Sequence, residues 1–297
     1  MAESLKVLRR RVRSIKNIKQ ITRAMEMVSA AKLRRAQATL MAARPYAAKL
    51  QELLAHVASS SVIEEHPLFQ PREGNRKTLV LFTADRGLAG SFNTNLIKKT
   101  EELLRGDPAA KWELVLVGRR GRDYFQRRSW PVARSWIGLV GQADDGLARE
   151  LANYLLERFL RDETDQILLV YSSFISTVVY RPTVAQYLPL TPEALGIRLD
   201  EAGQAEARQE VDYILDPSAD IVFDSLLPRY LSSKIYITLA EMATSEHSAR
   251  MISMNNATKN CNDLQDSLQL RLNNARQAAI TKELLDIVGG AEALKTG

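Results

Sequence analysis

The sequence has a single cysteine among its 297 residues, and this scarcity excludes two kinds of architecture. One cysteine cannot form a disulfide within the chain, and it cannot supply the thiolates of a cysteine-rich zinc site. Histidine is almost as rare, and His56, His66 and His247 lack the close spacing of metal ligands. We therefore expect no metal site, and we interpret Cys261 as a small apolar group within the fold.

Long apolar stretches are also missing, because no run approaches the roughly 20 residues of a membrane-spanning helix. The sequence therefore predicts no direct insertion into a membrane. The arginine-rich start resembles a mitochondrial transit peptide. Seven-residue apolar spacing runs on from Leu5, however, so we interpret this segment as part of the mature fold.

Proline and glycine are both absent between Pro228 and Gly289. Roughly 67 residues without a breaker, at about 1.5 Å each, predict a helix about 100 Å long that opens with Pro228 in its first turn. Ordinary globular helices have about 8–20 residues. A heptad pattern runs through this segment, and its residues, many of them small, indicate a coiled coil with a weak seam. The seam residues are Met254, Ala257, Cys261, Leu264, Leu268, Leu272, Ala275 and Ala279.

Residues 3–59 predict a second long helix, again with apolar residues at heptad spacing. Between residues 19 and 29 the seam positions are polar, and the apolar residues move one place, so we expect the buried face to rotate locally there. Pro45 predicts a kink or a break. The shifted apolar residues are Ile18, Ile21, Met25 and Val28. The economical arrangement is an antiparallel coiled coil of the two terminal helices, with the longer C-terminal helix protruding alone.

Charge is distributed unevenly along the chain. Residues 1–57 contain 13 Lys and Arg against 3 Glu, whereas the remainder contains 28 basic against 32 acidic residues. A helix with a net charge of +10 favours an acidic partner, which could be nucleic acid, anionic lipid or an acidic protein surface. Residues 191–224 are acidic and predict a surface connection back to the long helix.

The middle of the chain alternates short apolar runs with helical patterns. Strands are expected at 77–83, 112–117 and 166–171, an edge strand at 178–188, and helices at 93–105, 119–128 and 144–161. This order predicts a mostly parallel, Rossmann-like α/β domain. The expected fold class is α/β plus a long antiparallel coiled coil. The expected parts are an N-terminal helix (1–60), an α/β domain (75–215) and a C-terminal helix (216–297).

Catalytic motifs are hard to find in this chain. The turn at 84–92, with GLAG after a strand, is only weakly similar to a phosphate-binding loop, since it fits neither the dinucleotide nor the Walker pattern. We favour a tight structural turn. Ser245, Glu246, His247 and Ser248 are neighbours along one helix and cannot face one another as a triad, so we expect a solvated patch. No catalytic, cofactor-binding or metal-binding residues are assigned.

Four segments carry a resemblance to a known family. They are residues 9–37 (RRRVRSIKNIKQITRAMEMVSAAKLRRAQ), 83–93 (TADRGLAGSFN), 245–258 (SEHSARMISMNNAT) and 273–294 (NNARQAAITKELLDIVGGAEAL). These segments resemble the gamma subunits of F-type ATP synthases, and the similarity runs from end to end. The family implies a coiled-coil shaft with an α/β domain at its foot, which turns as a rotor without a catalytic site of its own.

The resemblance also implies partners and a location. The partners are the alpha and beta subunits of the catalytic head, an epsilon-type subunit and the membrane c-ring, at the cytoplasmic face of the bacterial inner membrane. No cofactor and no nucleic acid are expected. The positions implied to meet the surrounding subunits are Met25, Arg250, Arg276, Gln277, Thr281 and Glu283.

Two other classes of function remain open from the residues alone. A basic coiled-coil protein that binds nucleic acid would explain the charge of residues 1–57, and its affinity would fall steeply with salt. A nucleotide-dependent α/β enzyme would explain the turn at 84–92. The first leaves the C-terminal motif unexplained, and the second lacks phosphate ligands.

Overall fold

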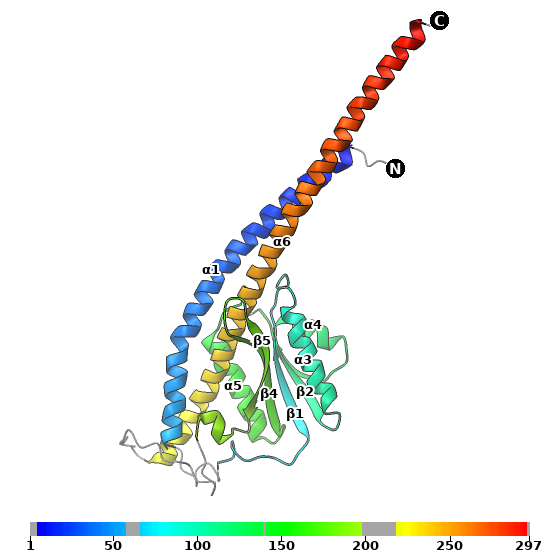
Figure 1. The fold of residues 1–297 in the computed structure, drawn as a ribbon. Coiled ribbons are helices and arrows are strands. Elements are labelled where there is room, and N and C mark those ends of the chain that lie inside the picture. The colour runs from blue at the N-terminus through cyan, green and yellow to red at the C-terminus, as the bar shows by residue number, and fades with distance from the viewer. Residues whose placement is uncertain (1–4, 58–65, 139–140, 198–217, 296–297) are drawn as a thin grey trace. The chain divides into compact units, whose positions relative to one another are not determined.

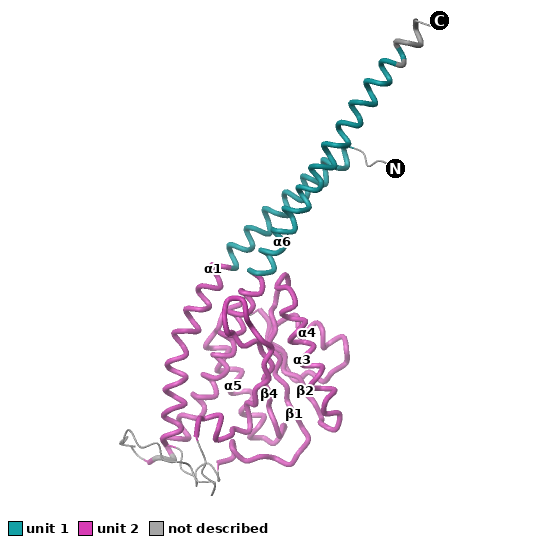
Figure 2. The backbone as a smooth tube through the Cα atoms, in the orientation of Figure 1, with its two compact units in different colours: residues 1–29, 251–297 teal, residues 30–250 magenta. Residues whose placement is uncertain are grey.

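The computed structural model describes residues 5–57, 66–138, 141–197 and 218–295. These form two compact units, residues 1–29 with 251–297 and residues 30–250 (Figure 2). Two long helices, α1 (Leu5–Val57) and α6 (Ala219–Lys295), contribute to both units. The expected α/β fold with long terminal helices is confirmed. Most of the acidic connection expected at 191–224 lies outside the described residues.

Helix α1 continues through Pro45 without a break. An interior proline removes one backbone hydrogen bond at a cost of about 3 kcal/mol. Two buried side chains follow Pro45 on the same helix. Leu50 and Leu54 are 5% and 0% exposed and lie in the core of the unit of residues 30–250. Their packing offsets the missing bond, and the alternative of two separate helices is therefore wrong.

Helix α6 begins at Ala219 rather than at Pro228, so the proline lies inside the helix. The expectation that it occupies the first turn is wrong. Phe223 and Leu227 before it and Leu231 after it are each at most 1% exposed. Burial of these three side chains, each contributing about 1.5–3 kcal/mol, holds the segment helical across the proline.

The unit formed by residues 1–29 and 251–297 is an antiparallel helix pair. Thr258 Oγ1 donates to Thr22 Oγ1 over 2.9 Å, and Asn255 Nδ2 donates to Glu26 Oε1 over 2.8 Å. Residue numbers rise along one helix where they fall along the other, so the two helices run in opposite directions. The buried residues of this seam are Leu8, Thr22, Ser29, Met254 and Cys261.

The expected rotation of the buried face near residue 22 is wrong. Thr22 and Ser29 keep the heptad phase and are 9% and 3% exposed, while Ile18, Ile21 and Val28 are 44–60% exposed. The two buried hydroxyls bond to backbone carbonyls one turn earlier in α1, so their burial leaves no unsatisfied donor. On the other helix Leu264 is 51% exposed and does not fill the seam as expected.

The unit of residues 30–250 is built on a five-stranded sheet of order β3-β2-β1-β4-β5 (Figure 1). Its strands are β1 (Arg76–Phe82), β2 (Lys111–Val117), β3 (Val132–Trp136), β4 (Gln166–Phe174) and β5 (Tyr180–Leu188). All neighbours are parallel except β4 and β5. The expected mostly parallel sheet is confirmed, but β3 was not expected.

Three helices connect the parallel strands: α3 (Phe92–Gly106), α4 (Arg119–Gln126) and α5 (Asp145–Leu160). A single-turn helix η1 (Pro192–Leu195) follows β5. Right-handed crossovers place α3 and α4 on one face of the sheet and α5 on the other, because the chain reverses its direction across the sheet after β3. The buried run Leu79–Phe82 in β1 lies at the centre of this core.

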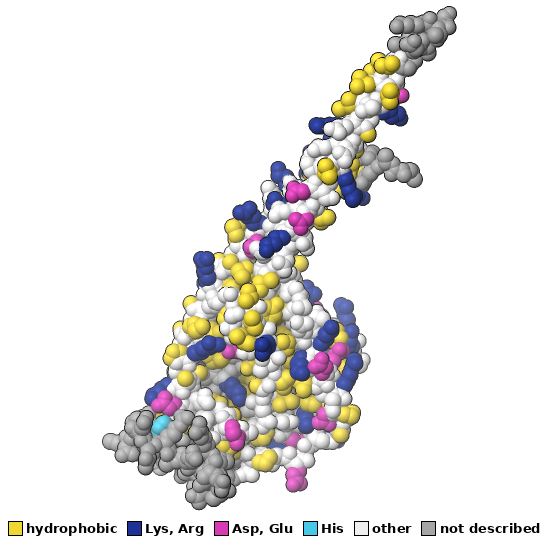
Figure 3. Space-filling view, viewed as in Figure 1, with side chains coloured by type: hydrophobic (Ala, Val, Ile, Leu, Met, Phe, Trp, Pro, Cys, Tyr) yellow, Lys and Arg dark blue, Asp and Glu magenta, His cyan; other side chains and the backbone are white. Residues whose placement is uncertain are grey.

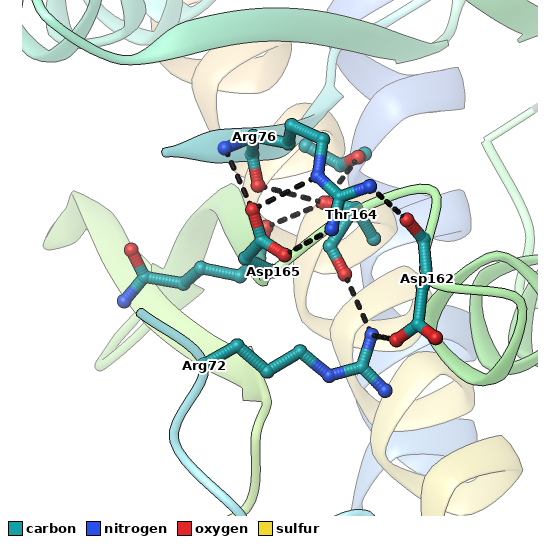
Figure 4. Close-up of polar contacts among 7 residues, drawn as sticks. Arg72, Arg76, Asp162, Thr164 and Asp165 are labelled. Atoms are coloured by element: carbon teal, nitrogen blue, oxygen red, sulfur yellow. Dashed lines mark hydrogen bonds and ion pairs between the residues drawn. The ribbon is translucent and has the colours of Figure 1, made fainter. Parts of the chain in front are cut away.

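An ion-pair cluster holds the amino end of β1 (Figure 4). Arg76 donates to Asp165 through Nε at 3.1 Å and Nη2 at 2.6 Å, and its backbone N–H donates to the same carboxylate at 2.9 Å. These bonds from Arg76 hold the pKa of Asp165 below its usual range. Arg72 pairs with Asp162 at 2.7 Å and lies over the Phe159 ring. The cluster connects the start of β1 to the residues just before β4. It lies at the amino end of β1, whereas the turn at 84–92 follows the carboxyl end of this strand.

Candidate partner-contact surfaces

The turn after β1 satisfies the amide groups at the start of α4. Arg119 N donates to Asp85 Oδ1 at 2.8 Å, and Arg120 N donates to Ala84 O at 3.1 Å. Gly121 N donates to Thr83 Oγ1 at 2.9 Å. In a phosphate-binding loop such free amides at a helix N-terminus face the anion. Here the turn itself accepts the amides of α4, so these amides are not free to bind an anion.

A glycine makes this close approach of strand and helix possible. Gly118 precedes α4 with φ of +100°, and a Cβ there would lie 1.9 Å from the carbonyl oxygen of Thr83. No side chain fits such a gap, and the left-handed backbone also favours glycine. The turn at 84–92 is therefore locked against α4.

A buried ion pair on α6 reaches this same turn. Glu246 Oε1 accepts from Arg250 Nη2 at 2.6 Å, and the two side chains are only 6% and 10% exposed. Arg250 Nε also donates to the carbonyl of Gly87 at 3.3 Å. Burial raises the pKa of Glu246, and the charge of Arg250 opposes that rise. Arg250 thus has partners within the chain, and its contact with another subunit stays a prediction.

Three more side chains of α6 reach backbone carbonyls of other segments. Ser245 Oγ donates to Ser172 O at 3.2 Å, Ser248 Oγ donates to Thr177 O, and His247 Nε2 lies 2.9 Å from Gly141 O. Together with the ion pair, these side chains connect α6 to β4, to the turn that follows β4, and to the loops around residues 87 and 141. We call this set the α6 clamp: Ser245, Glu246, His247, Ser248 and Arg250.

The expectation of a solvated patch around His247 is wrong. The imidazole is 3% exposed, and its contact with Gly141 O requires a proton on Nε2. Nδ1 then faces Arg250 Nη1 at 3.5 Å as an acceptor. Burial, together with the charges of Arg250 and Lys32, lowers the pKa of His247 to about 4, although the bond to Gly141 acts the other way. His247 is therefore a neutral structural side chain at physiological pH.

The far end of α6 is different, because its side chains are exposed. Arg276, Gln277 and Glu283 lie at the surface, as does Thr281, whose Oγ1 donates to Gln277 O at 3.0 Å within the same helix. Figure 3 shows hydrophobic side chains on the surface of this terminal segment. These are 49–68% exposed, and they are Ile280, Leu284, Leu285, Ile287 and Val288.

Met25 lies on α1 in the same unit as that exposed end. Its side chain is half-buried, and its carbonyl accepts from Ser29 Oγ at 2.7 Å. The next residue, Glu26, bonds across the seam to Asn255. The structure therefore gathers four of the six predicted contact residues on the exposed end of α6. Met25 lies on α1, and Arg250 lies in the α6 clamp.

Comparison with known proteins identifies the family. A family model described as ATP synthase matches residues 4–294. A curated ATP synthase gamma chain of Pelotomaculum thermopropionicum is 44% identical over 292 residues, covering 98% of this chain and 99% of that protein. The ATP synthase gamma chain of Moorella thermoacetica is 46% identical over 290 residues, 97% and 98% of the two chains. This chain belongs to the ATP synthase gamma chain family.

Solved structures agree in fold with this family. A chain in the mitochondrial ATP synthase of Euglena gracilis (OSCP/F1/c-ring) superposes with a TM-score of 0.68 at 20% identity, covering 99% of this chain and 95% of that one. A chain in the central stalk and c-ring structure of Tetrahymena thermophila mitochondrial ATP synthase gives 0.60 at 24% identity, covering 80% and 99%. At this identity the likeness concerns the fold.

The described ranges contain neither a cluster of metal-binding side chains nor a helix suited to cross a membrane. Within residues 5–57, 66–138, 141–197 and 218–295, no cluster of three or more His, Cys, Asp or Glu side chains could hold a metal ion. Over the same ranges, no helix combines the length and apolar character needed to cross a membrane.

Sequence reasoning missed the α6 clamp, although one signal points to it. Thr244–Ser248 is a run of five polar residues in a helix, which exceeds one turn of 3.6 residues, so some of them must face inward. All five are in fact at most 5% exposed. The partners of Ser245, His247 and Ser248, which are Ser172, Gly141 and Thr177, lie far away in sequence and carry no local signal.

Proposed function

We propose that this chain is the central rotor of an F-type ATP synthase. It would couple proton or sodium flow through the membrane c-ring to ATP synthesis or hydrolysis at catalytic sites on the alpha and beta subunits. Family membership over nearly the whole chain carries the proposal. In this role the chain is a non-catalytic subunit of a multi-subunit enzyme. It would rotate, and the reaction would take place on the alpha and beta subunits.

The exposed end of α6 supports contact with the catalytic head. A row of side chains such as Leu284 and Leu285, 58% and 67% exposed, leaves apolar surface in water unless a partner covers it. Arg276 and Gln277 beside this row can donate to carboxylates or carbonyls of a partner loop. The residues proposed to meet alpha and beta subunits are Met25, Arg250, Arg276, Gln277, Thr281 and Glu283.

The charge of α1 supports the same assignment. Arg9, Arg10, Arg13 and Lys16 are exposed, and α1 has no acidic residue in its first turn. Acidic segments of the beta subunits would complement this surface at close range, where screening by salt is weakest. A rotor whose faces differ in charge and shape presents different contacts to each catalytic site.

Rotation then couples to catalysis through differential contact. Each beta subunit would favour the conformation that best fits the face of the shaft turned toward it, so turning the shaft shifts the conformational equilibria in sequence. The proposed parts are the helices of residues 1–60 and 216–297 as the shaft and residues 75–215 as the α/β domain at its foot. That domain would join an epsilon-type subunit and the c-ring at the cytoplasmic face of the bacterial inner membrane.

Reconstitution tests the rotor function directly. The purified chain is mixed with alpha and beta subunits of the same source, and complex formation and ATP hydrolysis are measured with and without it. We expect a complex with one copy of this chain and hydrolysis that depends on it. Alpha and beta subunits that ignore the chain would overturn the proposal.

Variants of α6 locate the contact. Gln277→Leu removes a donor from the predicted contact set, whereas Gln269→Leu makes the same change at an exposed position outside it. We expect Gln277→Leu to lower the hydrolysis rate of the reconstituted complex several-fold, and Gln269→Leu to leave it within about twofold. Equal effects of the two variants would remove Gln277 from the contact set.

A further inference from the structure

A cavity of about 290 Å³ lies between α1, α6 and the loop that precedes α5. Lys32, Arg35 and Thr39 of α1 line one side, Gln142 lines the loop side, and His247 of α6 lines a third. All of these residues belong to the compact unit of residues 30–250. The volume lies just below the range for drug-sized ligands, about 300–1,000 Å³, so it suits only a small ligand.

The charges around this cavity are not balanced. No carboxylate of the described residues forms an ion pair with Lys32 or Arg35, although most arginines of the α/β sheet domain have such a partner, as Arg76 and Arg158 do. The buried carboxylate of Glu246 pairs with Arg250 at 2.6 Å. Asp85 lines a smaller neighbouring space, together with Gly141, Gln142 and Glu246. The residues that line the cavity itself include two cationic side chains and no carboxylate.

The charge of Lys32 acts on the α6 side of the cavity. Burial is the main cause of the lowered pKa of His247, and the charges of Arg250 and Lys32 act in the same direction. Positive charge that disfavours an imidazolium favours an anion in the same space. Gln142 adds a side-chain amide, which can donate to an oxygen atom, whereas Thr39 Oγ1 donates to Arg35 O at 3.1 Å within α1.

We propose that this cavity binds a small phosphate-type oxyanion between Lys32 and Arg35. The arginine fork matches two oxygens of such an anion, the lysine supplies a point charge, and Gln142 supplies a neutral donor. The anion would be either free inorganic phosphate or the terminal phosphate of a nucleotide, since both present the same group. Binding would join α1 to the loop at 141–143 and so brace the helix against the domain beside it.

Calorimetric titration of the full-length chain tests this site. Inorganic phosphate is titrated at constant ionic strength, with sodium chloride as the blank and ADP as a second titrant. We expect saturable one-to-one binding. Binding of both titrants or of phosphate alone assigns the site to free phosphate, and binding of ADP alone assigns it to a nucleotide. Saturable binding of neither titrant overturns the proposal.

Adjacent positions on α1 provide the matched control. Lys32→Gln and Arg35→Gln each remove a charge from the cavity, and we expect each to weaken binding about tenfold or more, because each removes a charged hydrogen-bond donor to the anion. Arg34→Gln removes the same charge one residue away, from an exposed position that does not line the cavity. An equal loss in Arg34→Gln would mean non-specific attraction and would overturn the proposal.

A titration of the histidines gives a second readout at the site itself. The chain has three histidines, so His247 can be assigned by NMR from the signal that disappears in His247→Gln. An anion bound in the cavity should raise the pKa of His247 and leave the signals of the other two histidines unchanged. Binding that moves none of the three, or all three alike, would place the anion elsewhere.

Discussion

Two stretches of α6 show how one helix serves two purposes. Between Thr244 and Arg250 every residue is at most 9% exposed, and most of the polar side chains reach another segment of the chain. Between Arg276 and Val288 nearly every side chain is exposed, and Thr281 bonds only to its own helix in the described contacts. The backbone is the same, so the neighbours decide whether a polar residue holds the fold or is available to a partner.

The difference teaches which substitutions separate stability from function. A buried charge that loses its partner is costly, because water cannot replace the partner. An exposed charge loses little, since water solvates it in both states. Substitutions in the α6 clamp should therefore act on the free energy of unfolding, and substitutions at the exposed end should act on assembly.

The largest expected effect comes from Arg250→Ala. It leaves Glu246 buried without its cation and should lower the free energy of unfolding by about 3–5 kcal/mol. Arg276→Ala, the same change at the exposed end, should stay within about 0.5 kcal/mol. Urea unfolding followed by tryptophan fluorescence measures both, since Trp112, Trp130 and Trp136 all lie in the α/β domain. Similar losses of unfolding free energy in the two variants would contradict the difference between the buried and the exposed stretch of α6.

The next effect is a dependence on pH through His247. Its pKa is about 4 in the folded chain, against an ordinary value of 6.5. Between these values the unfolded chain binds more protons, so the free energy of unfolding should fall as the pH drops from about 6.5 to about 4.

One variant isolates the contribution of His247. Glu246, whose pKa is raised, contributes the opposite slope, because its folded form holds its proton more tightly. The comparison is therefore between the native chain and His247→Gln, in urea titrations repeated at several pH values. The variant should lose the fall assigned to His247, and an unchanged profile would contradict the buried neutral imidazole.

A smaller effect is expected from the serine hydroxyls of the clamp. Ser245→Ala removes the bond to Ser172 O and should cost about 1 kcal/mol, because it leaves a buried carbonyl with one partner fewer. Thr281→Ala removes a comparable side-chain bond at an exposed site and should be neutral or slightly stabilising, since alanine is the better helix former. Thermal unfolding of the two variants measures this difference in stability. A larger loss of stability in Thr281→Ala than in Ser245→Ala would contradict the expectation.

The smallest effect on stability is expected from Leu285→Gln. This side chain is 67% exposed, so the free energy of unfolding should change by less than about 0.5 kcal/mol. Complex formation with alpha and beta subunits should weaken clearly, because the partner can no longer bury the side chain. Loss of stability without loss of assembly would show that the end of α6 is a structural element.

Much of the fold could be predicted from local patterns. The apolar run Leu79–Phe82 has the composition of a buried parallel strand, and the absence of glycine and proline after Pro228 indicates one long helix. Strand β3 was not predicted from the sequence because Val132–Trp136 is short and has polar residues within it. The start of α6 was misplaced because packing of Phe223, Leu227 and Leu231 outweighs the local preference of Pro228.

The sequence by itself determined the family, through four segments that resemble known members, and also the fold class and the two long helices. The fold class and the helices depend on local composition and periodicity, which a chain carries wherever its neighbours are. Only the tertiary structure decided that Arg250 and His247 are buried, that Thr22 and Ser29 rather than Ile21 and Val28 fill the seam, and that Asp85 caps α4. Each of these depends on which distant segment supplies the hydrogen-bond partner, and the burial of a polar group is decided by that partner.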